Sequence, residues 1–319
     1  MLGGEKLHGV MTKRIALAYS LVLLLLVSCG SHGRKQLPIV VASADSPEQL
    51  VLGQITVLAL EAAGYSVIDK TGLGRPWMVR AALEAGNVDI CWEYTGDTWA
   101  SHLGHDQPVA EPGELYERVR QEDAQNGIVW LPVAPCQRRL VLLMREPDAQ
   151  SKDIASITDL VRHMDRVAPY LSLCVPEQLY GAVGGIRGME RFYGLRFDEG
   201  QVHLMSMSEG YQALARGECD CTVGFSTDGE MASGNLRSLD DDRGFFQGSN
   251  LSVAVRTPLL QERQGLATTL GQITNLLTQE AMVELNRRVA VEADRPGDVA
   301  RRFLIRNGVI SGWPGTGDE

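Results

Sequence analysis

The stretch 37-LPIVVASADSPEQLVLGQITVLALEAAGYSVI-68 decides the fold class of this chain. Residues 37–43 form a short apolar run that leads into a polar turn, as expected of a buried strand. Residues 48–64 carry apolar side chains at helical spacing and end on Gly64, a favoured residue just past a helix. Residues 65–68 read as a second strand. The order strand, helix, strand predicts an α/β domain with a largely parallel sheet.

The alternation of strand and helix continues as far as residue 255. Further strands are expected at 88–92, 128–131, 139–144, 171–175, 219–224 and 251–255, and helices at 77–85, 114–126, 189–193 and 208–216. Ser156 is the expected cap of the helix that follows it. From residue 261 the chain is mainly helical, over 261–277, 279–289 and 296–307. A chain that builds part of one α/β domain, then a second, and then returns to the first would bind a ligand between them.

Composition and motifs exclude several classes of function. The 319 residues carry a formal net charge of −10, which argues against nucleic acid or an anionic membrane surface as a partner. No Ser/His/Asp or Cys/His set stands in a motif context, so we expect no enzyme, no catalytic residue and no cofactor. His102, His105 and Asp106 have a spacing that could hold a metal, but three residues in a polar loop are a weak signal. We therefore expect no metal site.

The N-terminus has the order of a bacterial lipoprotein signal. Lys13 and Arg14 precede an apolar run from residue 15, which ends in 26-LVSC-29. This order predicts a signal peptide over 1–29, acylation of Cys29, and a polar tether at 30–36. The run is short for a transmembrane helix, which is the alternative reading. Since residues 1–10 fit no signal, Met11 is an alternative start. The pattern predicts an exported protein that is attached to the membrane by its lipid alone.

Acylation of Cys29 leaves five cysteines, an odd number. They are Cys91, Cys136, Cys174, Cys219 and Cys221. An exported protein could oxidise two pairs of these at most. We expect Cys219 and Cys221 to lie on one face of a strand, too far apart for an easy disulfide, and to serve as small buried apolar residues.

Several stretches, taken in order, resemble one family. They are 82-ALEAG-86, 89-DICWEYTG-96, 130-WL-131 with 134-AP-135, 211-YQALARGE-218, 225-FSTDG-229, 239-LDDD-242 with 245-FF-246, and 298-DVARRFL-304. They are similar to stretches of the substrate-binding proteins of ABC importers for glycine betaine, choline and carnitine. The resemblance implies a two-lobed, type II periplasmic-binding-protein fold whose lobes are joined by two crossover strands. Lobe 1 would span 37–135 and 249–319, and lobe 2 would span 136–248.

In this family a trimethylammonium group is held in a box of four aromatic rings, because a quaternary cation cannot donate hydrogen bonds and binds best to π faces. The resemblance places the four box positions at Tyr94, Leu140, Phe225 and Ser249. Two walls have therefore lost their ring. At roughly 1–2 kcal/mol per contact, the loss is about 2–4 kcal/mol, or about 30- to 1000-fold in affinity. Either nearby rings replace the lost ones (Trp77, Trp99, Phe246) or the ligand differs.

Charged residues flank the box positions. Asp97 would attract a cation and repel a carboxylate, which favours choline-like cations over glycine betaine; the alternative is a helix cap. Of Arg138 and Arg139, one is expected on the surface and the other to face the cleft, where it could pair with an anionic group. We expect Arg139 among the ligand-binding residues.

The resemblance implies a solute-binding protein that delivers a quaternary-amine-type osmolyte to an ABC permease and its ATPase. One alternative keeps the fold but makes the chain an exported binding or sensor lipoprotein for a different small cation or amino acid. An exported enzyme is a third hypothesis, against which the missing pair of nucleophile and base counts.

Overall fold

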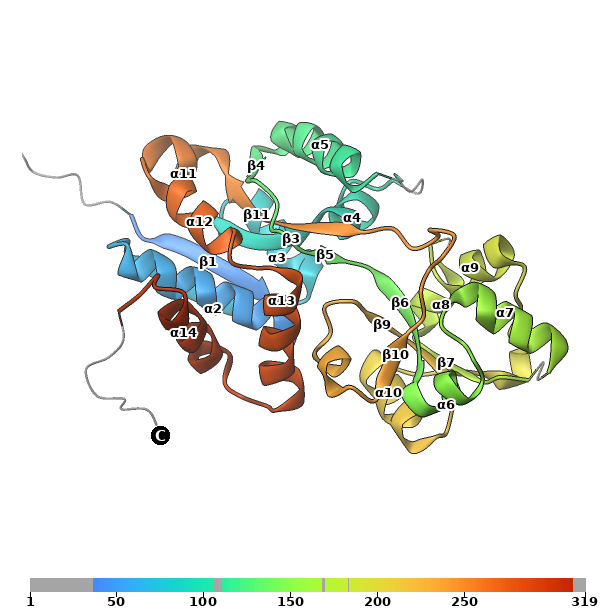
Figure 1. The fold of residues 1–319 in the computed structure, drawn as a ribbon. Coiled ribbons are helices and arrows are strands. Elements are labelled where there is room, and N and C mark those ends of the chain that lie inside the picture. Colours follow the sequence, from blue (N-terminus) through green and yellow to red (C-terminus); the bar gives the residue numbers. More distant parts are fainter. Residues whose placement is uncertain (1–36, 106–108, 110, 168–169, 183, 312–319) are drawn as a thin grey trace, which may run out of the picture. The chain divides into compact units, whose positions relative to one another are not determined.

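A computed structural model describes residues 37–311 except 106–108, 110, 168–169 and 183. The predicted signal peptide and tether, Cys29 with its predicted acylation, and Asp106 lie outside the described residues. The described residues from Ile39 onward form one compact unit, which contains two β-sheets with helices (Figure 1). None of the helices in the described part of the chain combines the length and apolar character that crossing a bilayer requires.

The first sheet has the strand order β2-β1-β3-β11-β4, and β5 pairs with the start of β11. Its strands are β1 (Ile39–Ala44), β2 (Val67–Gly74), β3 (Ile90–Tyr94), β4 (Ile128–Trp130), β5 (Gln137–Arg138) and β11 (Ser249–Arg256). β1 runs parallel to β2 and β3, whereas β11 runs antiparallel to β3 and β4. The sheet is therefore mixed, because β11 runs against the direction that the other five strands share. The expectation of a largely parallel sheet holds for strand direction, but the pairings of β11 are antiparallel.

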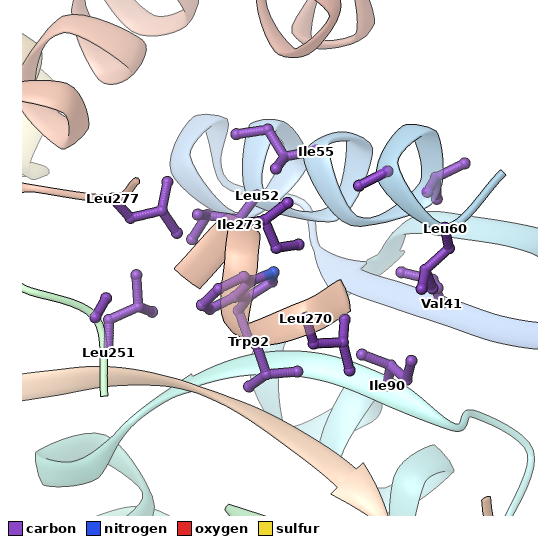
Figure 2. Packing of buried hydrophobic residues seen from close by; sticks show 14 of the residues in the cluster. Val41, Leu52, Ile55, Leu60, Ile90, Trp92, Leu251, Leu270, Ile273 and Leu277 are labelled. Carbon is purple, nitrogen blue, oxygen red and sulfur yellow. The ribbon is translucent and has the colours of Figure 1, made fainter. Parts of the chain in front are cut away.

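Helices cover both faces of the first sheet. On one face lie α2 (Pro47–Ala62), α12 (Leu266–Thr274), α13 (Gln279–Asn286) and α14 (Pro296–Arg306), and on the other lie α3 (Pro76–Glu84) and α5 (Pro112–Asp123). Strand side chains alternate between the two cores, as the pleat requires: Val253 and Val255 face the first, and Ala254 faces the second. Figure 2 shows the Trp92 ring among Leu52 and Ile273. Burial on both faces explains why β1 and residues 251–255 of β11 read as largely apolar runs.

The second sheet has the order β10-β6-β9-β7-β8. Its strands are β6 (Leu140–Arg145), β7 (Leu173–Val175), β8 (Val202–Leu204), β9 (Cys221–Phe225) and β10 (Leu236–Ser238). Helices α7 (Ile157–Arg166) and α9 (Ile186–Tyr193) contribute to the core on one face, and α10 (Met207–Arg216) to the core on the other. Ser156 caps α7 as predicted, within a reciprocal capping box with Asp159.

The remaining helical segments are short. They are α4 (Thr95–Asp97), α6 (Glu146–Ser151), α8 (Glu177–Gly181), α11 (Thr257–Glu262), η1 (Thr98–His102), η2 (Ala124–Asn126), η3 (Glu199–Gln201), η4 (Gly229–Ser233) and η5 (Arg287–Val291). The helix predicted at 261–277 is wrong, because α11 ends at Glu262 and α12 begins at Leu266. Gly265, between them, has a φ of 87°, a left-handed conformation that interrupts a helix.

The expectation that Cys219 and Cys221 share a face is also wrong. Cys219 precedes β9 and packs with Cys174 and Tyr211, whereas Cys221 packs in the opposite core with Val223. Strand alternation therefore does not extend back to Cys219. All five cysteines of the described chain are buried and free, and the interpretation of Cys219 and Cys221 as small buried apolar residues is confirmed.

Segments η4 and η5 approach one another at Gly229. A Cβ placed on Gly229 would lie 2.4 Å from both the backbone nitrogen and the Cα of Arg287. Asn286 strengthens the same contact, since its Nδ2 donates to the backbone oxygen of Thr227 at 2.7 Å. The close approach therefore requires a residue without a side chain.

We expect Gly229→Ala to lower the free energy of unfolding by about 1–3 kcal/mol, because the methyl group meets backbone that cannot rotate away. The matched control is Gly271→Ala within α12, where a Cβ meets nothing within 4 Å. There the same substitution should stabilise the chain by roughly 0.5–1 kcal/mol. Urea denaturation measures both, and equal effects of the two substitutions would contradict the close-approach argument.

Candidate functional site

Two aromatic rings meet around one arginine side chain. Tyr94 ends β3 of the first sheet, and Phe225 ends β9 of the second. The guanidinium carbon of Arg138 lies 3.7 Å from the centroid of the Tyr94 ring and 4.6 Å from that of the Phe225 ring. Both distances fall within the cation–π range of about 6 Å. In this structure the cation on the two rings belongs to the chain itself, and the binding of a ligand cation there stays a prediction.

Carboxylates complete the surroundings of Arg138. Its Nη2 forms an ion pair with Asp97, and its Nη1 lies 3.9 Å from Oε1 of Glu48. Glu48 also accepts a hydrogen bond from Nδ2 of Asn286 at 2.7 Å. The side chain of Arg138 is only 16% exposed, whereas that of Asp97 is 58% exposed. The charge of Asp97, expected to await a ligand, is therefore paired within the chain.

Asp97 is not a helix cap. It is the third residue of α4, whose N-cap position is Tyr94, and its side chain makes no capping hydrogen bond at the start of η1. The alternative interpretation of Asp97 as a cap is therefore wrong, and the ion pair with Arg138 is its role in the structure.

Leu140 and Ser249, the two positions without a ring, lie beside this group. Leu140 is the cross-strand neighbour of Phe225, and Ser249 is the cross-strand neighbour of Arg138. Ser249 Oγ accepts a hydrogen bond from the backbone nitrogen of Gly96 at 2.8 Å, so this serine holds the start of α4 in place. A polar side chain here thus supports the turn that carries Asp97.

Of the three rings considered as replacements, Trp99 and Phe246 pack against other rings and Trp77 is largely exposed. Trp77 is 64% exposed on α3. The ring of Trp99 stacks on His105 with centroids 3.6 Å apart, and Phe246 packs edge-on against Phe245 at 5.0 Å. The rings that lie on Arg138 in the described residues are therefore those of Tyr94 and Phe225.

Arg138, rather than Arg139, is the arginine on the rings. Arg139 is exposed and donates from Nη2 to Oε1 of Gln137 at 2.9 Å. It lines a cavity of about 680 Å³ together with Ser226 and Gln279. Its assignment as a ligand-binding residue stays a prediction, attached to this larger cavity and not to the rings.

The space next to the ring of Tyr94 is small. A cavity of about 100 Å³ is lined by Glu48, Glu93, Tyr94, Asp97, His102 and Arg138. Typical ligand pockets measure roughly 300 Å³ or more. Phe225 does not line this cavity, so the small volume describes the room beside Tyr94, where the guanidinium of Arg138 already lies.

Glu93 is a buried acid on the opposite side of β3 from Tyr94. Its Oε2 accepts from Oγ of Thr98 at 3.2 Å and lies 3.9 Å from Nε2 of His102. Burial raises the pKa of Glu93 to about 7, although the guanidinium of Arg80 works to lower it. Burial likewise lowers the pKa of His102. An acid inside the apolar run of β3 was a visible signal in the sequence that reasoning from motifs missed.

His102 and His105 serve separate partners. Nε2 of His105 lies 2.8 Å from Oε2 of Glu122, while His102 faces Glu93. Within the described ranges, no three His, Cys, Asp or Glu residues come together as metal ligands could.

Comparison with known proteins supplies the family. A family model described as the substrate binding domain of ABC-type glycine betaine transport system matches residues 37–306. A protein of Pseudomonas aeruginosa named glycine-betaine-binding protein is 33% identical over 263 residues, covering 81% of this chain and 84% of that protein.

Solved structures share the fold. The structure of apo YehZ from Escherichia coli is 25% identical, with a TM-score of 0.73 over 86% of this chain and 100% of that one. A structure described as a glycine betaine/carnitine/choline ABC transporter is 22% identical with a TM-score of 0.76, covering 85% and 99% of the two chains, and supports the fold alone. The predicted α/β periplasmic-binding-protein fold is confirmed.

The buried Glu93 predicts a pH-dependent stability. Since its pKa rises from 4.5 in the ordinary state to about 7 in the folded chain, the folded chain binds this proton more tightly than the unfolded chain. The stability that the protonated Glu93 contributes is therefore fully present below pH 4.5 and is lost as the pH rises through about 7. Glu93→Gln removes that loss. The difference in free energy of unfolding, Glu93→Gln minus wild type, should be about 1–3 kcal/mol larger at about pH 8 than at about pH 5.

Urea denaturation at both pH values measures this difference. Glu177→Gln, at an exposed position, is the control. If the two variants respond equally to pH, burial does not control the proton of Glu93.

Proposed function

Because this chain belongs to the family of substrate-binding domains of ABC-type glycine betaine transport systems, we propose that it is an exported, lipid-anchored binding protein. It binds a small quaternary-amine osmolyte and delivers it to the permease of an ABC importer. The family consists of solute-binding proteins and not of enzymes. The observation that carries the ligand class is the ring pair of Tyr94 and Phe225, with a cation already seated on both rings.

The two sheets are proposed as two ligand-binding lobes, over 37–135 with 249–319 and over 136–248. The support is topological, because Tyr94 ends a strand of the first sheet and Phe225 a strand of the second. The chain passes between the sheets near β5 and again at the start of β11. A ligand held by both rings would link the two lobes, which is the geometry of closure on a solute.

Charge supports a cationic ligand. Glu48 and Asp97 contribute two negative charges around the rings and Arg138 one positive charge, so this group has a formal net charge of −1. The P. aeruginosa relative is named for glycine betaine, which carries a quaternary ammonium. We keep the prediction that choline-like cations bind better than glycine betaine, with Glu48 now adding to Asp97.

A different ligand is the second candidate. Leu140 and Ser249 supply no ring, and Ser249 is engaged with Gly96. A site with two rings instead of four would suit another small cation or amino acid in an exported binding or sensor lipoprotein.

We expect calorimetric titration with choline and with glycine betaine to give saturable binding of at least one of them. Phe225→Ala should weaken that binding by about 5- to 30-fold, as roughly 1–2 kcal/mol of cation–π contact is lost. Phe192→Ala is the matched control, because that ring also carries an arginine, Arg243, at 5.1 Å but lies elsewhere on the second sheet's helices.

Equal weakening by Phe192→Ala would show a general effect on the fold. Failure of the wild type to bind either compound would favour the second candidate, a different small cation or amino acid as the ligand.

The lipid anchor has a separate test. Metabolic labelling with a palmitate analogue in a bacterial host should mark the wild-type chain and leave Cys29→Ala unmarked, since the thiol of Cys29 is the predicted acylation site. Equal labelling of the two chains would contradict the lipoprotein prediction.

A further inference from the structure

We propose that Arg138 is an internal competitor for the ligand cation: a quaternary ammonium reaches the rings of Tyr94 and Phe225 only by displacing its guanidinium. This inference rests on the proposed function, since it names the residue that regulates affinity at the same site. It concerns how the site is filled and not which solute fills it.

The guanidinium of Arg138 and a ligand's quaternary ammonium need the same space. A quaternary ammonium binds a ring by lying over its face within about 6 Å of the centroid. The guanidinium carbon of Arg138 already lies over each of the two rings, 3.7 Å from the centroid of Tyr94 and 4.6 Å from that of Phe225. Since atoms cannot overlap, Arg138 and a quaternary ammonium exclude one another from the ring pair. Beside Tyr94, a cavity of only about 100 Å³ leaves little room for the two together.

The side chain of Arg138 is held in place. It is paired with Asp97, lies 3.9 Å from Glu48, and is 16% exposed. These contacts stabilise the seated arrangement, in which ring faces and carboxylates are both satisfied. A ligand therefore binds with the affinity of the open site reduced by the fraction of molecules in which Arg138 is away from the rings.

The side chain of Arg138 can leave while the backbone stays. Gln137 and Arg138 pair with Asn250 and Ser249 in a short antiparallel ladder, which fixes the main chain. Asp97 is 58% exposed, so its carboxylate can remain paired with the guanidinium on the solvent side. Displacement is then a rotation of one long side chain, and it needs no rearrangement of β5.

Calorimetry on Arg138→Gln tests the inference. Choline and tetramethylammonium chloride are the probes, the second because it presents the quaternary ammonium alone. We expect Arg138→Gln to bind both at least about 10-fold more tightly than wild type. The matched control is Arg243→Gln, because the guanidinium of Arg243 lies over Phe192 and Tyr193 at 5.1 Å from each ring but outside the site. This control should leave both affinities unchanged.

A second pair of variants separates occupancy from charge, since Arg138→Gln also frees the charge of Asp97. The same substitution is made in an Asp97→Asn background. If Arg138 blocks the rings, it should still tighten tetramethylammonium binding there. If the gain disappears with the charge of Asp97, Arg138 is only a counter-ion and the inference is overturned.

A measurement on the wild-type chain covers the case in which Arg138→Gln fails to fold. In protein labelled with ¹⁵N-arginine, the Arg138 side-chain protons should be shifted upfield by the two ring faces, and saturation with tetramethylammonium should abolish that shift. Binding that leaves the shift in place would overturn the inference, as would unchanged or weaker binding by Arg138→Gln.

The two proposals fail separately. If the wild type binds no quaternary ammonium but Arg138→Gln does, the internal competitor is supported and the wild-type ligand is another compound. If neither binds one, both proposals are wrong. If the wild type binds and Arg138→Gln binds no better, only the internal competitor is wrong.

Discussion

The site depends on a two-residue ladder between two stretches of chain that are distant in sequence. Gln137 and Arg138 pair with Asn250 and Ser249. The same segment is anchored to the first sheet, because the backbone nitrogen of Asn250 donates to Oγ of Thr95 at 3.0 Å and Ser249 accepts from Gly96. One strand pairing of only two residue pairs would be marginal by itself. These side-chain bonds make the crossing rigid, and the rigid crossing brings Tyr94, Phe225 and the guanidinium of Arg138 together.

Three acidic side chains lie around that crossing, and they differ in how deeply they are buried. Asp97 is largely exposed and Glu48 nearly buried beside the guanidinium, whereas Glu93 is buried behind Tyr94, on the other face of β3. A buried carboxylate is tolerated because it is hydrogen-bonded and because burial raises the pKa of Glu93 to about 7. The formal charges of Glu48, Asp97 and Arg138 at the rings sum to −1, and the positive one among these three is covalently part of the chain.

Sequence reasoning reached the fold but not the local chemistry. Apolar periodicity located most strands and helices, and Ser156 was identified as a cap, because these signals are local. The resemblance to a family placed the positions around the rings, which periodicity could not. It did not separate Arg138 from Arg139, because neighbouring residues of an extended segment point to opposite sides and a two-residue strand is too short to show its register. The face of Cys219 was wrongly predicted for a related reason, since this residue lies just outside the strand to which it was assigned.

The reactivity of the five buried thiols of the described residues reports where the chain unfolds. Burial raises the pKa of each of them above the ordinary range for a thiol. Since the thiolate is the species that attacks a disulfide or an alkylating reagent, the folded chain is nearly inert to both. Each sulfur becomes reactive only when its own region unfolds. Because Cys91 and Cys136 lie in the cores of the first sheet and Cys174, Cys219 and Cys221 in those of the second, the order in which they are modified would report which half of the chain opens first.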